Sequence, residues 1–134
     1  MSISNSKIFL VDENEEIYSI IKLKKTDIFY DNLDFLNKLN FNGEVFNNPI
    51  KINFTNDFIE KNSDLNIDLS KISLNFKNKL NYSNEPAIGS IFFSKLGKTN
   101  LIKFELDDQL IKFQSEKKIN KKPLFNGEII FKPF

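Results

Sequence analysis

Two short segments of the sequence carry residue types associated with ligand chemistry, and both depart from the motif that they resemble. Gly97-Lys98-Thr99 matches the end of a phosphate-binding loop, but Phe92 occupies the position of its first glycine, and a strand-like segment follows instead of a helix. Residues 64–68 have the acidic spacing that opens a calcium-binding loop, but Leu69 and Asn75 replace its required Gly and Glu. We therefore predict a turn for the first segment and a half-buried strand for the second.

Other charged side chains form clusters without the additional groups that binding or catalysis requires. The densest cluster places four ammonium groups within six residues: Lys117, Lys118, Lys121 and Lys122. Lysine alone cannot read base edges, and no aromatic platform for stacked bases is interleaved with these residues. Acidic candidates such as Glu105 lie in or beside a turn, whereas a glycosidase needs two carboxylates facing each other across a cleft. We expect a solvated loop for the lysines, no nucleic-acid partner and no catalytic residues.

The composition excludes several classes of catalytic and metal site. The chain contains no Cys, His, Trp or Arg. It therefore lacks a thiolate nucleophile, a histidine general base, the usual zinc ligands and the bidentate guanidinium that holds carboxylate or phosphate. We predict that the protein is not an enzyme and has no metal site and no cofactor. The abundance of Asn, Lys, Ile and Phe, which have A/T-rich codons, indicates an AT-rich genome.

Length and charge describe the general class of the protein. The 134 residues correspond to one domain, 1–134, and 40% of them are hydrophobic, which is too many for a disordered chain. The formal net charge is only +1. We find no signal-peptide pattern and no apolar run long enough to span a bilayer. The sequence predicts a soluble chain that is cytoplasmic when synthesised and that can later be incorporated into a particle.

Alternating apolar residues predict strands over most of the chain. Residues 7–23 form a hairpin around the acidic turn at residues 12–16. Apolar residues occupy odd positions from Leu65 and even positions up to Leu80, so an inserted residue or a bend is required near Ser70. Further strands are expected at residues 50–54, 88–93, 101–106, 110–113 and 128–131.

One segment has the period of a helix instead. Its apolar residues recur at spacings of four, three and three: Phe29, Leu33, Leu36 and Leu39. This predicts a helix near residues 27–41, which Asp27 or Asp31 caps and which ends at Asn42-Gly43. The same Asn-Gly pair recurs at residues 126–127, where we expect it to form a turn. The predicted fold is mainly β, with α+β as the alternative class: an antiparallel β-sandwich or barrel of about eight short strands with this helix at one end.

Fifteen Phe residues are more aromatic bulk than short strands usually bury. We predict that some of them contact a partner, and the candidates are Phe92, Phe93, Phe131 and Phe134. The function that follows is a non-enzymatic structural or assembly subunit that acts through protein–protein contacts, with a homo-oligomer or other proteins as partners. A virion component, such as part of a phage, is its expected setting. The alternative is a small β-barrel or sandwich that binds a glycan or an apolar small molecule.

Overall fold

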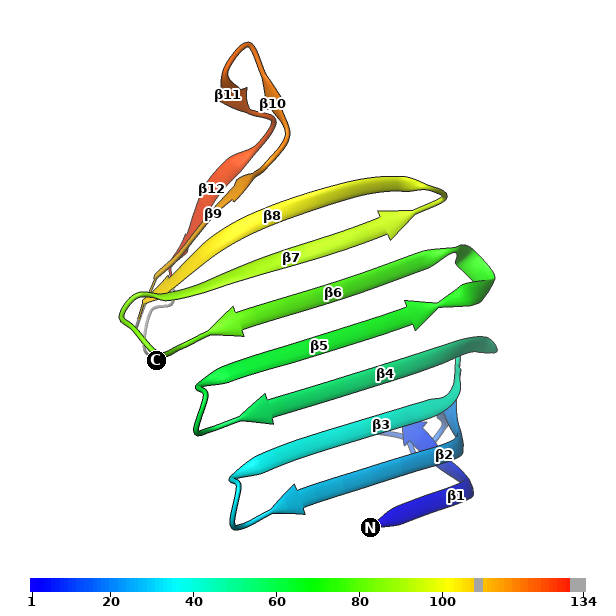
Figure 1. Cartoon of the computed structure of the whole chain (residues 1–134). Helices are drawn as coiled ribbons and strands as arrows, with labels where there is room; N and C mark the ends of the chain where they lie inside the picture. Colours follow the sequence, from blue (N-terminus) through cyan, green and yellow to red (C-terminus); the bar gives the residue numbers. More distant parts are fainter. Residues whose placement is uncertain (108–109, 131–134) are drawn as a thin grey trace.

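A computed structural model describes residues 1–107 and 110–130 of the chain, and one antiparallel sheet of ten strands dominates it (Figure 1). The strands, in their order across the sheet, are β1 (Ser2–Val11), β2 (Ile17–Asp31), β3 (Leu36–Val45), β4 (Asn48–Asp57), β5 (Asn62–Leu69), β6 (Leu74–Asn81), β7 (Ala87–Lys95), β8 (Lys98–Asp107), β9 (Leu110–Ser115) and β12 (Asn126–Ile130). The predicted mainly β class is confirmed.

A two-stranded ribbon, β10 (Lys118–Ile119) and β11 (Lys122–Pro123), projects from the C-terminal end of the sheet (Figure 1). It occupies the segment that we expected to be a solvated loop. Its turn is formed by Asn120 and Lys121, both in the left-handed region with φ of 52° and 67°. Two consecutive residues with positive φ match the twist of paired strands, which is why so short a ribbon closes here.

Tight turns join the strands at one end of the sheet. The β3–β4 turn contains Phe46 and Asn47, with φ of 50° and 59°, and the β7–β8 turn contains Leu96 and Gly97, with φ of 50° and 76°. Between them, the 3₁₀ turn η1 (Ser70–Ile72) connects β5 to β6. The change of phase near Ser70 is therefore a bend between two strands, which is one of the two alternatives predicted.

Two wider turns at the opposite end are held by aspartate side chains. Asp31 Oδ1 accepts hydrogen bonds from two backbone N–H groups of the β2–β3 turn at 2.8 and 3.2 Å. Asp57, which ends β4, does the same in the β4–β5 turn, with both distances 2.9 Å. Phe35 and Lys61 then adopt positive φ of 47° and 50° and return the chain to the sheet. Each carboxylate supplies hydrogen-bond acceptors that the turn backbone lacks.

The helix predicted near residues 27–41 is wrong. This segment is the end of β2, a turn and the start of β3, and no α-helix occurs anywhere in the described part of the chain. Asp31 does accept N–H groups as a helix cap would, but Phe35 reverses the chain after a single turn because it adopts positive φ. Gly43, expected to end the helix, lies inside β3.

The sandwich or barrel of about eight strands is not observed either. The sheet is one open layer, and β1 and β12 form its two edges within residues 1–107 and 110–130. Alternation of apolar and polar residues specifies that one face of a sheet is apolar, but it does not supply a second layer to cover that face. The predicted strands are present, and the predicted closure around a core is not.

Candidate functional site

The pairing register divides the sheet into two chemically different faces. Residues directly opposite each other on paired strands share a face, and successive residues along a strand alternate. One such row crosses five strands and contains only large apolar side chains: Phe41, Ile52, Ile67, Phe76 and Phe93. The residues between them along each strand project from the other side. One side of the sheet is therefore apolar and the other polar.

We call the first side the apolar face and define it by the large hydrophobic side chains of β3 to β9 that share this register. These are Leu39, Phe41, Val45, Ile50, Ile52, Phe54, Leu65, Ile67, Leu69, Leu74, Phe76, Leu80, Ile91, Phe93, Ile102, Phe104, Leu106, Ile111 and Phe113. The charged residues that share its register among the described strands, Lys95 and Lys98, lie beside the β7–β8 turn. The interior of the apolar face is therefore uncharged.

No second layer formed by residues 1–107 and 110–130 covers the apolar face. Every side chain that defines it is partly exposed, and Leu23 on β2, with 9% exposure, is the one buried hydrophobic residue among those described. The accessible surface of the chain is 10186 Å². A compact monomer of 15.7 kDa exposes about 7,300 Å². The excess of about 2,900 Å² is the area that a normal core would have buried.

Two phenylalanine rings pack onto glycines within this face. The Phe104 ring of β8 covers Gly89, its cross-strand partner on β7, so closely that a Cβ on Gly89 would overlap it. The Phe113 ring of β9 covers Gly127 of β12 in the same way, 2.7 Å from the position of a Cβ. The glycines accommodate the rings close to the sheet. The apolar face is therefore flatter between β7 and β12 than elsewhere.

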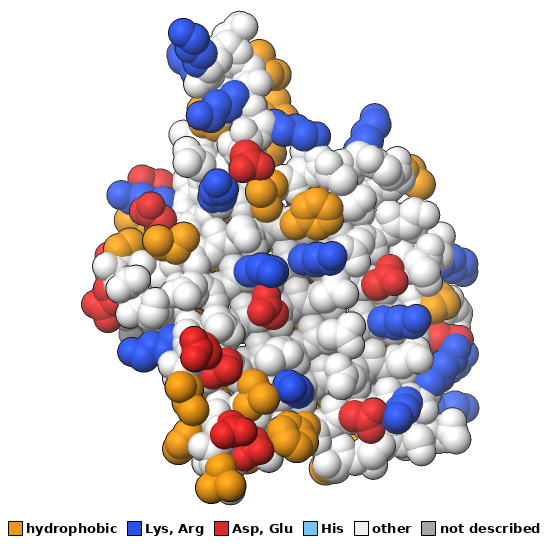
Figure 2. Space-filling view, in the orientation of Figure 1, with side chains coloured by type: hydrophobic (Ala, Val, Ile, Leu, Met, Phe, Trp, Pro, Cys, Tyr) orange, Lys and Arg blue, Asp and Glu red, His pale blue; other side chains and the backbone are white. Residues whose placement is uncertain are grey.

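The opposite side, the polar face, carries Asn, Ser, Thr, Lys and Asp side chains. Figure 2 looks onto this side, where lysines and acidic residues are mixed among uncharged polar ones. Phe92 is one of its few aromatic residues, and the Lys77 Nζ lies 5.9 Å from its ring centroid. This distance is typical of a weak cation–π contact. Mixed charge and hydrophilic side chains are expected of a surface that stays in water.

A shallow hollow of about 430 Å³ opens on the polar face where β8, β9 and β12 meet. Charged residues of alternating sign cross it in register, from Glu105 to Lys112 to Glu128. Lys103 also lines it and forms an ion pair with Glu116 at 3.4 Å. Such a hollow offers hydrogen bonds to a polar ligand, but it is open to solvent, whereas most small-molecule sites enclose their ligand.

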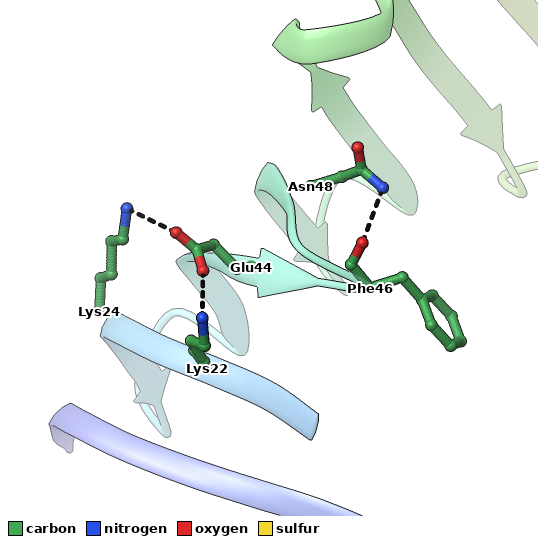
Figure 3. Close-up of polar contacts among 5 residues, drawn as sticks. All are labelled: Lys22, Lys24, Glu44, Phe46 and Asn48. Carbon is green, nitrogen blue, oxygen red and sulfur yellow. Dashed lines mark hydrogen bonds and ion pairs between the residues drawn. The ribbon is translucent and has the colours of Figure 1, made fainter. Parts of the chain in front are cut away.

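Glu44 on β3 forms a compact charged cluster with two lysines of β2 (Figure 3). Its Oε2 lies 2.9 Å from the Lys22 Nζ and its Oε1 lies 3.4 Å from the Lys24 Nζ. The register of β2 shifts between Leu23 and Lys25, so an extra residue at this point brings both lysines to one carboxylate. The hydrogen bond from Lys22, then that from Lys24, lowers the pKa of Glu44 below its ordinary value of 4.5.

The Glu44 cluster predicts a pH-dependent contribution to stability. A carboxylate whose pKa is lower in the folded chain stabilises the fold above the unfolded pKa, and this contribution is lost as the pH falls through the folded value. We expect Glu44→Gln to lower the melting temperature slightly at pH 7 and to have less effect below about pH 4. Glu13→Gln is the control, because Glu13 is exposed and has no ion pair in the described structure. Equal effects of Glu44→Gln at both pH values would contradict the prediction.

The adjacent β3–β4 turn places an aromatic side chain in solvent beside this cluster. Phe46 is 66% exposed, and its carbonyl oxygen accepts a hydrogen bond from the Asn48 Nδ2 at 3.0 Å (Figure 3). A bulky residue with positive φ is unfavourable unless local hydrogen bonds hold the turn. The Asn48 carboxamide supplies one such bond.

The structure separates the aromatic residues that we predicted as partner contacts. Phe92 and Phe93 are neighbours on β7, and they project from opposite faces because strand side chains alternate. Phe93 belongs to the apolar face and Phe92 to the polar face. Phe131 and Phe134 lie outside the described residues. The four candidates are therefore not shown to form one patch.

The weaker motifs take the local structures that we predicted. Gly97-Lys98-Thr99 spans the β7–β8 turn and the start of β8, and residues 64–68 lie in β5. Within residues 1–107 and 110–130, no group of three acidic side chains could hold a metal ion. No helix in the same residues is long and apolar enough to cross a bilayer. Comparison with protein-family models, with curated proteins and with solved structures gives no match.

One functional candidate escaped the sequence analysis. Asn78 lies on β6 at a position of the apolar face, with Leu65 and Ile91 opposite it on the two neighbouring strands. Its Oδ1 is buried and has no hydrogen-bond partner in the described structure. The sequence did contain this information, because Asn78 lies between Phe76 and Leu80 at a position where the alternation predicts a hydrophobic residue. A single polar residue in an apolar phase is easily attributed to imperfect alternation.

Proposed function

We propose that this chain is a non-enzymatic assembly subunit that acts through protein–protein contacts made by its apolar face. The observation that supports this is the exposure of the face: seven adjacent strands present large hydrophobic side chains, and no described element covers them. A monomeric protein rarely leaves a contiguous apolar patch of more than a few hundred Å² in water. A larger particle, such as a virion, would bury this surface permanently.

A ligand-binding module is the second candidate function, and the hollow on the polar face supports it. Its alternating Glu and Lys side chains, with Gln114 and Asn126, could hydrogen-bond a glycan. The two functions use different faces of the sheet, because a glycan would occupy the polar face and leave the apolar face exposed. We prefer assembly, since only assembly removes the apolar surface from water.

The proposed function predicts association that is independent of charge. We expect the purified chain to bind an apolar dye such as anilinonaphthalene sulfonate, or to associate, and its association to persist in 1 M NaCl. We expect no DNA or RNA binding by gel shift at about 0.15 M salt, because lysine–phosphate contacts weaken steeply as salt is added.

Two neighbouring residues of β5 provide a matched test. Leu65→Lys places a charge on the apolar face and should reduce dye binding or association, whereas Asn66→Lys places it on the polar face and should change neither. A monomer that binds no dye would contradict assembly and favour the ligand-binding function. Micromolar nucleic-acid binding at physiological salt would contradict both.

A further inference from the structure

The surplus accessible surface of the chain is large enough for a permanent dimer. The chain exposes about 2,900 Å² more than a compact monomer of its mass. Obligate homodimers bury roughly 2,000–5,000 Å² or more in total, counted over both partners. Covering the excess surface of two copies would bury about 5,800 Å², at the upper end of that range, so a second copy of this chain provides enough surface.

The charge distribution also suits contact between identical chains. The interior of the apolar face has no charged side chain among the described residues, and the whole chain carries a formal net charge of only +1. Two copies therefore neither repel each other strongly nor need a partner of opposite charge. Two sheets stacked on their apolar faces, about 10 Å apart, form an ordinary β-sandwich.

Asn78 indicates how the two copies would be related. Its strand, β6, is the fourth of the seven strands that form the apolar face, and Asn78 lies near the middle of that strand. A residue on a two-fold axis faces its own copy, and a carboxamide is self-complementary because it carries both a donor and an acceptor. Asn78 has an Oδ1 without a hydrogen-bond partner in the described structure. That atom has almost no accessible surface within the chain, so the carboxamide must first rotate about χ2. The rotated Oδ1 then faces the second copy, and the two Asn78 side chains can pair.

We infer that a second copy of this chain covers the apolar face, giving a two-layered, two-fold symmetric β-sandwich with Asn78 of each copy near the axis. This inference rests on the proposed function and names the partner in it. The sandwich that we expected within one chain then forms between two. A polar pair at the centre of an apolar interface also specifies register, as buried asparagines do in coiled coils.

Light scattering coupled to size exclusion tests the oligomeric state. We expect twice the 15.7 kDa mass of the chain, in low salt and in 1 M NaCl. Ile91→Asp, which charges the apolar face, should give a folded monomer at concentrations where the parent is fully dimeric. Ser90→Asp, the preceding residue on the polar face, should stay dimeric. A dimer that survives Ile91→Asp would overturn face-to-face pairing.

Cross-linking tests the geometry without relying on a destabilising variant. The chain has no cysteine, so one thiol can be introduced alone. Asn78→Cys should be cross-linked into dimers by a short bis-maleimide that spans the layer separation, and Lys77→Cys, on the other face, should not. Absence of the Asn78→Cys product would overturn the two-fold arrangement. A monomer that still binds apolar dye would overturn self-pairing but leave the proposed function, and a monomer without dye binding would overturn both.

Discussion

Gly89→Ala should destabilise the sheet by about 1–3 kcal/mol, although alanine normally suits a strand better than glycine. The physical reason is the ring of Phe104, which occupies the space that a Cβ on Gly89 requires. Without the ring, the same substitution would gain roughly 0.5–1 kcal/mol, because glycine loses more conformational freedom on folding. A loss of stability in Gly89→Ala therefore indicates that the Phe104 ring covers the glycine, and a gain indicates that it does not.

A double variant isolates this contact. In Gly89→Ala/Phe104→Ala, the ring that clashes with the new methyl group is absent, so the double variant should be more stable than the sum of the two single effects by about 1 kcal/mol or more. Ser90→Ala, on the opposite face of the same strand, should change stability by less than about 0.5 kcal/mol. Urea unfolding at one fixed protein concentration should be measured for the parent chain and all four variants, because association makes apparent stability depend on concentration. A stabilising Gly89→Ala would contradict the packing.

Ser115→Ala should cost about 1–3 kcal/mol and loosen the projecting ribbon. Ser115 is 3% exposed and ends β9, where its Oγ donates to the Lys117 carbonyl oxygen at 2.9 Å and accepts from the Phe125 N–H at 3.1 Å. Removing the hydroxyl leaves that N–H without this acceptor at the base of β10–β11. Leaving a buried donor unsatisfied lowers the free energy of unfolding by more than an average hydrogen bond contributes to it.

Limited trypsin digestion gives a second measurement of the same change. The ribbon segment contains four lysines, so loosening of its base should speed cleavage there before the sheet is cut. Ser94→Ala is the control, because Ser94 lies on β7 away from the ribbon and makes no side-chain hydrogen bond that the described structure contains. Unchanged cleavage and unchanged stability in Ser115→Ala would show that the hydroxyl does not anchor the ribbon.

Strands were predictable wherever alternation continued without interruption. The hairpin around residues 12–16 is confirmed, and its acidic turn is held by Asp12, whose Oδ1 accepts from two backbone N–H groups at 2.9 Å. The helix near residues 27–41 was not excluded by periodicity, because two strand ends and a four-residue turn can place apolar residues at helical spacing. What decided the outcome was positive φ at Phe35, a conformation that a phenylalanine rarely signals.

The two Asn-Gly pairs show a second reason why the sequence alone did not predict the local structure. Gly43 was expected to end a helix and Gly127 to lie in a turn, and both lie within strands. A Cβ on Gly43 would overlap the Lys22 carbonyl oxygen of β2 and the Phe41 ring of the same strand, and a Cβ on Gly127 would overlap the Phe113 ring of β9. The requirement for glycine arises from a neighbour that only the folded sheet supplies. A dipeptide pattern cannot distinguish this requirement from a need for positive φ.

The sequence indicated aromatic surface contacts as the type of candidate site, but it did not indicate which residues form the site. Excess phenylalanine led to the prediction of partner-contact residues, but individual residues could not be assigned without knowing which face each occupies. Phe92 and Phe93 illustrate this, because one register position separates a residue of the apolar face from one of the polar face. Asn78 required the cross-strand register as well, since its apolar surroundings come from β5 and β7.

The order of the strands has a consequence for folding kinetics. From β1 to β9, every strand pairs with the strand that precedes it in the chain, so most contacts join residues that are close in sequence. Low contact order favours rapid folding, and nearest-neighbour pairing lets each hairpin add to the one before it. The sheet can therefore grow strand by strand as the chain leaves the ribosome. The N-terminal hairpins need not wait for the C-terminal ones.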